Sequence, residues 1–309
     1  MRAIRRGDPR LCPLCERPMR PGVGPAQARS LRGHGTRVCE ACGIEIIEPL
    51  PQIDVLLDLY REDYRLHPTS TESRSSASSR VRGAAKTLIF MLHRWRYGRL
   101  ASDGLQPAGR VLEIGFGSGT RLEALARSGW DSAGLEVAAG PVESLRERIP
   151  DGDFRVGSIE TSDYPAETFD LVLLYHVLEH LDDPQPALEK IARMVRPDGR
   201  LVVALPNRDS LTRRIFRPYW YGYQHPEHLV QYSKRSLESV AAQSGLAVTR
   251  SRPQPYFHAV GDSLANIVDP AWTHPMRRRM IKVLAFPVGL VLVLLGDAAA
   301  IEIELERAG

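Results

Sequence analysis

A glycine-rich segment at residues 110–120, RVLEIGFGSGT, constrains the fold of this chain more than any other feature. Val111, Leu112 and Ile114 predict the end of a buried strand, and a helical pattern follows Thr120. Glycine lets the backbone approach a ligand closely, because it has no Cβ atom. A strand, a glycine turn and a helix in this order predict the ligand-binding turn of a doubly wound α/β fold.

The spacing of Gly115, Gly117 and Gly119 indicates which class of ligand the turn binds. A dinucleotide fold has G-x-G-x-x-G in front of a helix, whereas here the third glycine comes one residue early and Thr120 takes its place. The carboxylate of Glu113 would repel a pyrophosphate but suits the α-ammonium of a methionyl group. The pattern therefore favours S-adenosylmethionine (SAM) over NAD. A glycine turn without a ligand is the alternative, because a single glycine motif is weak evidence.

Three further segments predict strands of the same sheet, at residues 131–136, 154–159 and 169–174. The first ends in Glu136, about 20 residues after the glycine turn, where an acidic residue meets the ribose hydroxyls in α/β nucleotide folds. The third is a continuous apolar run, which is typical of a parallel strand buried on both faces.

These segments resemble the class I SAM-dependent methyltransferases over about residues 108–250. The resemblance is carried by VLEIGFGSGT, by FDLVLLYHVLEHLDDP and by RPDGRLVVALPN. It implies a Rossmann-like, doubly wound, seven-stranded sheet whose last strand, near residues 299–305, runs antiparallel. It also assigns the cofactor to Glu113, Gly115, Gly117, Gly119, Glu136, Ser158, Ile159 and Tyr175.

Three histidines are candidates for the base that removes a proton from a hydroxyl acceptor, since histidine titrates in the right range. His176 directly follows the predicted fourth strand. His225 and His228 belong to an aromatic segment, residues 216–232, that resembles the active-site cap of the same methyltransferases. An alternative is a metal site built from His176, His180, Glu227 and His228.

All four cysteines lie near the N-terminus, as the pairs Cys12-x-x-Cys15 and Cys39-x-x-Cys42. Two such turns complete a tetrahedral zinc site, so we predict one structural Zn²⁺ remote from catalysis. Two disulfides or two redox pairs fit less well, because thiols stay reduced in the cytosol and no thioredoxin-like pattern surrounds either pair. The segment resembles a zinc-binding extension found on some bacterial methyltransferases.

The polar tract at residues 69–80 marks the expected domain break. We predict a zinc-ribbon-like module at 1–50, a helix and Ser-rich linker at 51–83, and a methyltransferase domain at 84–309 with cap insertions at about 206–232 and 253–298.

Charge and hydrophobic runs bear on partners and location. The net charge of +4 is too small to argue for nucleic acid, and no secretory signal is visible, so a cytoplasmic location is expected. The uncharged run at 283–296 is too short to span a bilayer, and we expect it to cover the core or the acceptor pocket. The basic residues before it make weak membrane-surface contact through 277–296 the alternative.

The predicted function is SAM-dependent methylation of a small molecule, with a hydroxyl of a secondary metabolite, sugar or quinone-like compound as the acceptor. N- or C-methylation is the nearest alternative. Two further alternatives are not methyltransferases. One is a zinc-ribbon interaction protein with a degenerate Rossmann domain, and the other is a nicotinamide oxidoreductase. The sequence does not identify the acceptor or the oligomeric state.

Overall fold

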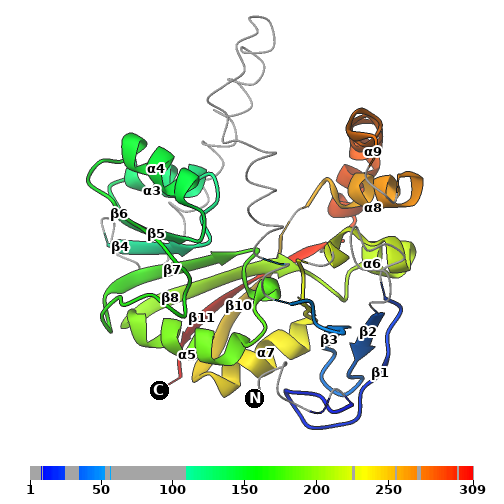
Figure 1. The fold of residues 1–309 in the computed structure, drawn as a ribbon, viewed down its shortest axis with the longest axis horizontal. Coiled ribbons are helices and arrows are strands. Elements are labelled where there is room, and N and C mark those ends of the chain that lie inside the picture. The colour runs from blue at the N-terminus through cyan, green and yellow to red at the C-terminus, as the bar shows by residue number, and fades with distance from the viewer. Residues whose placement is uncertain are drawn as a thin grey trace, which may run out of the picture. The chain divides into compact units, whose positions relative to one another are not determined.

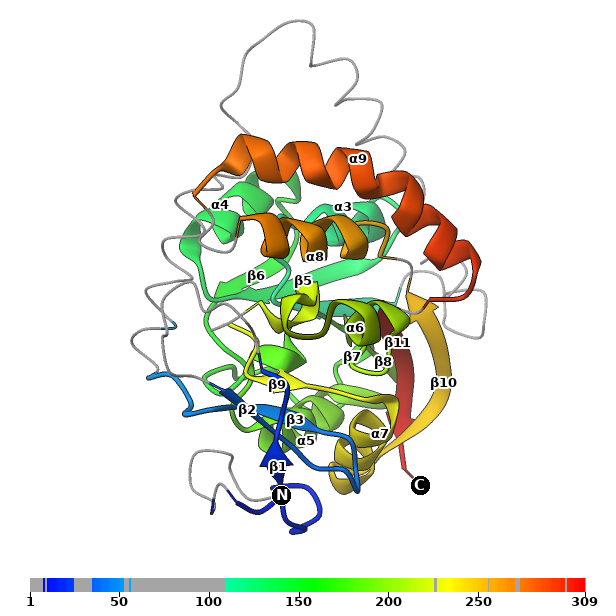
Figure 2. The same ribbon diagram turned by 90° about the vertical axis from the view of Figure 1, so that its right-hand side faces the viewer.

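Figures 1 and 2 show the fold of the chain in a computed structural model. It divides into two compact units, one of residues 1–56, 176–189 and 203–309 and the other of 57–175 and 190–202. The structure describes residues 8, 10–24, 35–52, 56, 109–224, 227–254, 256–269, 273–297 and 299–308. Most of the predicted linker at 51–83, the predicted start of the catalytic domain at 84 and the candidate His225 lie outside these residues.

The main sheet has seven strands in the order β10-β11-β8-β7-β4-β5-β6. The pairs β4–β5, β4–β7 and β5–β6 are parallel, whereas the last strand, β11, is antiparallel to β10. The doubly wound seven-stranded fold with an antiparallel last strand is therefore confirmed. The strands are β4 Arg110–Ile114, β5 Asp131–Glu136, β6 Asp153–Val156, β7 Phe169–Tyr175, β8 Val195–Pro206, β10 Leu246–Gln254 and β11 Ala300–Arg307.

Apolar side chains on both faces hold the central strands in place. Val111 and Leu112 of β4 lie opposite Leu171 and Val172 of β7, and all four are fully buried. Helices α3 (Thr120–Ala126) and α4 (Ala139–Arg148) lie together on one side of β4, β5 and β6 (Figure 1). A third helix, α5 (Pro184–Met194), contributes residues to both units, as β8 does. This packing fixes the glycine turn between β4 and α3.

A second, four-stranded sheet has the order β1-β2-β3-β9. Its first three strands, β1 (Arg20–Pro21), β2 (Gly35–Val38) and β3 (Glu45–Glu48), come from the cysteine-rich N-terminal segment. Its fourth strand, β9 (Val230–Gln231), comes from much later in the chain and pairs with β3. The N-terminal strands are therefore joined to the C-terminal half by backbone hydrogen bonds.

In the unit of residues 1–56, 176–189 and 203–309, a 3-10 turn at Leu178–His180 precedes β8, and, apart from α5, the other helices that the structure describes follow it. They are α6 (Leu211–Phe216), two short 3-10 turns at Arg217–Tyr219 and Tyr221–Tyr223, α7 (Lys234–Gln243), α8 (Ala259–Val268) and α9 (Pro275–Leu294). Helix α7 packs against β10, and α9 lies alongside α8 in both views (Figures 1 and 2).

Helix α9 corrects part of one prediction. The apolar run at 283–296 was expected to cover the core or the acceptor pocket, but it is not part of the core, because within it only Ala285 and Gly289 of α9 are buried. Leu284 and Leu294 are 75% and 76% exposed. The run is apolar on all sides of the helix, and α8 covers only one stripe of it. Because all sides are apolar, the sequence pattern does not reveal which side is covered. Among the described residues, no helix is long and apolar enough to cross a membrane.

Candidate functional site

The glycine turn between β4 and α3 has the backbone that its sequence predicts. Gly115, Gly117 and Gly119 have φ angles of 67°, 53° and 70°, a region that side chains rarely enter. A Cβ atom at Gly119 would lie 2.6 Å from Cδ1 of Leu145, so this glycine is required by packing. A Cβ atom at Gly117 would meet no atom of the described residues within 4 Å, so on this side the turn is open to a ligand.

Glu113, on β4 just before the turn, is 1% exposed and forms an ion pair with Arg121 of α3. Its Oε2 atom has no hydrogen-bond partner among the described residues. Burial raises the pKa of Glu113 to about 7, against the opposing charge of Arg121. A buried carboxylate oxygen that lacks a donor fits a ligand that brings its own cation, as the α-ammonium of SAM does.

Arg121 links two of the predicted cofactor residues. Besides pairing with Glu113, its guanidinium lies over the ring of Tyr175, 3.7 Å from the ring centroid. Tyr175 is the buried last residue of β7. Arg121 was not among the residues predicted from the sequence, although its place in the first turn of the helix after the glycines was a usable signal.

Glu136, the last residue of β5, ties the glycine turn to the neighbouring strand. Its Oε2 accepts a hydrogen bond of 2.9 Å from the N–H of Gly117, and its Oε1 accepts one of 2.8 Å from the N–H of Val137. Its Oε1 also accepts a longer bond of 3.4 Å from the N–H of Ala138, whereas Oε2 has a second lone pair that can accept a bond from a ribose hydroxyl. The carboxylate is 3% exposed and fixed in place before any ligand binds.

Ser158 and Ile159 lie in the turn after β6, because that strand ends at Val156, earlier than predicted. The N–H of Ser158 donates to Oγ1 of Thr161 over 3.1 Å, and Ile159 is buried. All eight predicted cofactor residues belong to one unit. The unsatisfied Glu113 oxygen, the open position at Gly117 and the ordered Glu136 fit the methionyl and ribose parts of SAM.

His176 directly follows β7 in the chain and belongs to the other unit. It has a φ of 55°, which is unusual for a residue with a side chain. Its N–H donates to the carbonyl oxygen of Ala204 over 2.8 Å, which holds this backbone in place. Its side chain is 38% exposed, and its Nδ1 lies 3.1 Å from Oε1 of Glu179.

Glu179 is the second functional side chain that the sequence analysis left without a role. Burial alone would raise its pKa, but the hydrogen bond and charge of His176 lower the pKa to about 2. The carboxylate is therefore ionised at neutral pH and orients the imidazole through Nδ1. The signal available in the sequence was the spacing of three residues between His176 and Glu179 after a strand.

His180 and His228 lie beside Glu179, and their rings meet edge to face with centroids 4.7 Å apart. Their Nδ1 atoms are each 2.8 Å from a backbone carbonyl, that of Glu227 and that of Gly222 respectively. Burial lowers the pKa of His180 and takes that of His228 to about 3, so both rings are neutral at pH 7. His228 is thus a weak proton acceptor.

One ligand atom from each of Glu179, His180 and His228 lies within 4.8 Å of the others, so the three could hold a metal ion. The predicted metal set of His176, His180, Glu227 and His228 therefore changes. Among the described residues the group is Glu179, His180 and His228, without His176, and Glu227 contributes only a backbone carbonyl beside Nδ1 of His180.

The predicted aromatic cap packs largely on itself. Trp220, Tyr221 and Tyr223 are buried in one hydrophobic cluster with Ala259 and Ala299. The hydroxyl of Tyr221 donates to the carbonyl oxygen of Ala299 over 2.7 Å. These rings therefore form part of the core of their unit, and the Tyr223 hydroxyl donates to the buried carboxylate of Glu45 over 2.9 Å. The sequence spacing did not reveal this burial.

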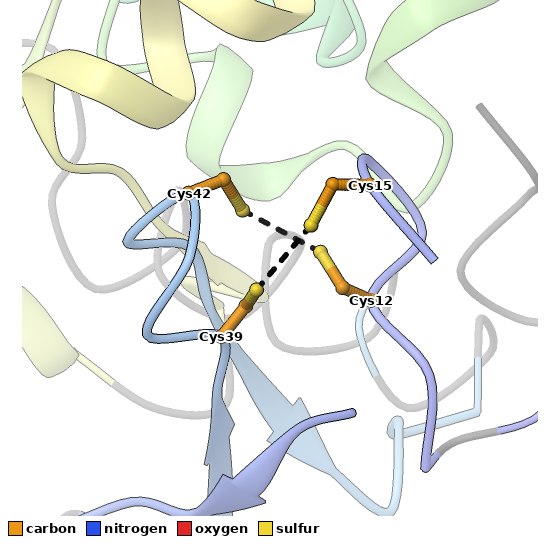
Figure 3. A group of neighbouring side chains, drawn as sticks. All are labelled: Cys12, Cys15, Cys39 and Cys42. Carbon is orange, nitrogen blue, oxygen red and sulfur yellow. Dashed lines mark hydrogen bonds between the residues drawn. The ribbon is translucent and has the colours of Figure 1, made fainter. Parts of the chain in front are cut away.

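The four cysteine thiols converge from two loops (Figure 3). The sulfur atoms of Cys12 and Cys42 are 3.5 Å apart, as are those of Cys15 and Cys39, and all four lie within 4.8 Å of one another. Disulfide sulfurs would be about 2.05 Å apart. Four sulfurs bound tetrahedrally to zinc at about 2.3 Å lie roughly 3.8 Å from each other, so this arrangement fits zinc.

The two cysteine turns have the same backbone geometry. The N–H of Glu16 donates to the carbonyl of Cys12, and the N–H of Gly43 donates to that of Cys39, each over 2.8 Å. Glu16 and Gly43 both have positive φ angles, of 56° and 78°. Glutamate therefore occupies a conformation that usually takes glycine, and the thiol cluster is preserved in spite of it.

Comparisons with known proteins agree with this geometry. Residues 89–251 match the model of a family described as a methyltransferase domain. The demethylmenaquinone methyltransferase of Renibacterium salmoninarum is 28% identical over 196 residues, which cover 60% of this chain and 76% of that protein. The ubiquinone biosynthesis O-methyltransferase of Azorhizobium caulinodans is 35% identical over 103 residues, or 32% of this chain and 41% of that protein. The chain thus spans less than half the length of the second relative.

Solved structures show the same fold at low identity. The 1,6-didemethyltoxoflavin N1-methyltransferase of Burkholderia thailandensis, solved with S-adenosylhomocysteine, is 12% identical with a TM-score of 0.53; the match covers 92% of this chain and 99% of that one. A putative sarcosine dimethylglycine methyltransferase from Galdieria sulphuraria is 16% identical with a TM-score of 0.53, over 71% of this chain and 86% of that one.

Proposed function

Since this chain belongs to the methyltransferase family, we propose that it transfers a methyl group from SAM to a hydroxyl group of a small molecule. The observation that carries the proposal is the buried Glu113, whose Oε2 lacks a donor among the described residues, next to a glycine turn that is open at Gly117. The structure of the toxoflavin-precursor methyltransferase, which contains S-adenosylhomocysteine, supports the choice of cofactor.

The residues of the β4–β5 region would hold the two polar ends of SAM. Glu113 would bind the methionyl ammonium, the backbone at Gly115, Gly117 and Gly119 would pass close to the methionyl group, and Glu136 would accept bonds from the ribose. Ser158, Ile159 and Tyr175 are assigned to the adenine and to the region of the sulfonium. When bound, SAM supplies a methyl group on a positively charged sulfur, ready for in-line displacement.

His176 would remove the proton of the acceptor hydroxyl. Its Nδ1 is held by the ionised Glu179, so Nε2 can take a proton and the resulting imidazolium is stabilised by the carboxylate. His228 is a poorer candidate, because burial lowers its pKa to about 3. His225 stays a candidate from the sequence.

The names of the relatives support our choice of acceptor class. The two curated relatives are named for demethylmenaquinone and for ubiquinone biosynthesis, which supports a quinone-like phenol. A sugar or another secondary metabolite fits the same chemistry. N- or C-methylation is the main alternative, and the toxoflavin-precursor enzyme is an N1-methyltransferase. A small-molecule acceptor in the cytoplasm is part of this proposal, and nucleic acid is not.

We assign one Zn²⁺ to the thiolates of Cys12, Cys15, Cys39 and Cys42. The metal would be structural, because four protein ligands leave no open position for a substrate. A separate zinc module at 1–50 and a catalytic domain from 84 onward stay proposals.

Calorimetric titration of the full chain with SAM and with S-adenosylhomocysteine tests the cofactor. Gly117→Val should abolish the heat of binding, because it fills the open position beside the turn. Gly140→Val is the matched control: this glycine also faces open space, but it lies in α4, and its substitution should leave binding unchanged. No heat with the unaltered chain would overturn the proposal and favour an interaction protein with a degenerate Rossmann domain.

The acceptor chemistry is tested with a matched set of ring compounds: a catechol, the corresponding aminophenol and the doubly O-methylated ring. Mass spectrometry should find a new methyl group on oxygen of the first compound. Methylation only at nitrogen or at ring carbon would refute O-methylation and retain the methyltransferase assignment.

A further inference from the structure

Helix α9 presents an unusually apolar surface. Many large hydrophobic side chains between residues 275 and 295 are exposed. Five of them are more than 60% exposed: Met276, Val283, Leu284, Leu294 and Leu295. A soluble monomer rarely exposes a continuous apolar patch of this kind without a partner. The other exposed members are Met280, Phe286, Val288, Leu290 and Val291.

The contact between α8 and α9 prevents this surface from turning inward. The buried stripe of α9 consists of Arg278, Ala285 and Gly289. A Cβ atom at Gly289 would collide with the carbonyl oxygen of Phe257, and one at Gly261 of α8 would lie 2.8 Å from the Cα atom of Lys282. Because the backbones already touch, rotation of α9 about its axis would break this packing. The two helices lie side by side in Figure 2.

The charges of α9 are all positive and gather in its first half. No acidic residue stands between Asp269 and Asp297 in the sequence. Arg277 and Arg279 are exposed, whereas Arg278 points inward and donates to the carbonyl oxygens of Ala265 and Asp269. Exposed cations followed by a long exposed apolar face are typical of a helix that lies in the interface of an anionic membrane.

A hollow of about 450 Å³ opens beside this surface. Its lining includes Arg279, His258 and the ion pair of Lys282 with Asp262, together with the apolar Val283 and Phe286. A cationic group next to apolar side chains suits a lipid phosphate next to the start of its acyl chains.

We propose that α9 docks on the surface of an anionic phospholipid bilayer, with Arg277 and Arg279 at the lipid phosphates and the exposed apolar face in the acyl boundary. A second copy of this chain fits less well. In a symmetric pairing of two α9 helices the arginines would find no acidic partner on the facing helix, since α9 has none. The proposal goes beyond methyl transfer and does not depend on the cofactor.

Flotation of the full chain with vesicles tests the proposal. The protein should float with vesicles that contain phosphatidylglycerol and stay behind with pure phosphatidylcholine, and added salt should weaken binding. Arg277→Gln with Arg279→Gln should lower the partition by roughly 30-fold, at about 1 kcal/mol for each cation near an anionic surface. Leu284→Asp with Leu294→Asp should abolish it.

Matched controls change similar side chains elsewhere in the same unit. Lys234→Gln with Arg235→Gln removes two exposed cations of α7, and Val23→Asp charges a side chain that is 53% exposed. Both should partition like the unaltered chain.

Equal partition of all variants, or no flotation with anionic vesicles, would overturn the proposal. A dimer in sedimentation that Leu284→Asp dissociates, without flotation, would also overturn it in favour of a second copy. Titration of the same samples with SAM measures cofactor binding separately. A failure of membrane docking can therefore be distinguished from a failure of the proposed function.

Discussion

Replacing Glu45 by glutamine should destabilise the unit that contains the thiol cluster. Glu45 is fully buried on β3 and accepts hydrogen bonds from Thr36 (2.7 Å), Arg208 (2.7 Å), Arg213 (3.2 Å) and Tyr223 (2.9 Å). The carboxylate thereby joins β2 and β3 to residues after β8. Glutamine has nearly the same shape, so the substitution removes the charge with little change in packing.

The expected loss follows from the two arginines. Their side chains are 17% and 14% exposed, so solvent compensates them poorly once the carboxylate is gone. Breaking a buried ion pair by removing one partner costs about 3–5 kcal/mol. Because glutamine keeps one acceptor oxygen, we place the loss in the free energy of unfolding at about 3 kcal/mol, the lower end of that range.

Urea unfolding measures this loss. With a slope of about 3 kcal/mol per molar urea, the midpoint should fall by roughly 1 M. Hydrogen exchange at β3 and β9 locates the effect. Glu48→Gln is the matched control on the same strand: Glu48 pairs with Arg37 at half-buried positions, so its loss should stay within about 1 kcal/mol. If Glu45→Gln costs no more than Glu48→Gln, the buried carboxylate does not join the two segments.

The pH dependence has a definite sign. Burial raises the pKa of Glu45, but the charges of Arg208 and Arg213 and the hydrogen bond from Thr36 lower it below its ordinary value. A group whose pKa is lowered on folding stabilises the fold above its unfolded pKa, about 4.3 for glutamate, and loses that contribution as the pH falls through the folded pKa. The stability difference between the natural chain and Glu45→Gln should therefore shrink below about pH 4.

The remaining predictions concern the metal, the base and the cofactor carboxylate. Elemental analysis should give close to one zinc per chain, and Cys39→Ser should release it and raise hydrogen exchange in β1–β3; a metal-free chain with four equally reactive thiols would contradict the site. His176→Ala should lower turnover by about 10²–10⁴ with SAM affinity nearly unchanged, and wild-type turnover in this variant would exclude His176 as the base. Burial raises the pKa of Glu113 to about 7, and only the ionised form attracts an ammonium, so SAM affinity should increase from pH 6 to pH 8. Glu113→Gln should bind more weakly at pH 8 and lose this dependence, and an unchanged pH profile in that variant would assign the effect to another group.

The sequence determined the elements whose signals are local. The strand predicted at 131–136 is β5, Asp131–Glu136, and the last strand falls where the family resemblance placed it. Apolar runs and the glycine turn act over a few residues, and the geometry of a strand, a turn and a helix is fixed at that range. For the same reason both cysteine turns were evident from their spacing, and the structure brings them together.

Only the tertiary structure decided which side chains meet across the chain. Glu45 lies 163 positions before Arg208, and no pattern in either segment specifies the other. The spacing of His176 and Glu179 was visible in the sequence, but the left-handed backbone at His176 was not, because residue type does not predict it. An apolar run such as that of α9 indicates only that burial of its side chains would be favourable. Whether it is buried depends on which neighbours cover it, and this is a property of the packed molecule.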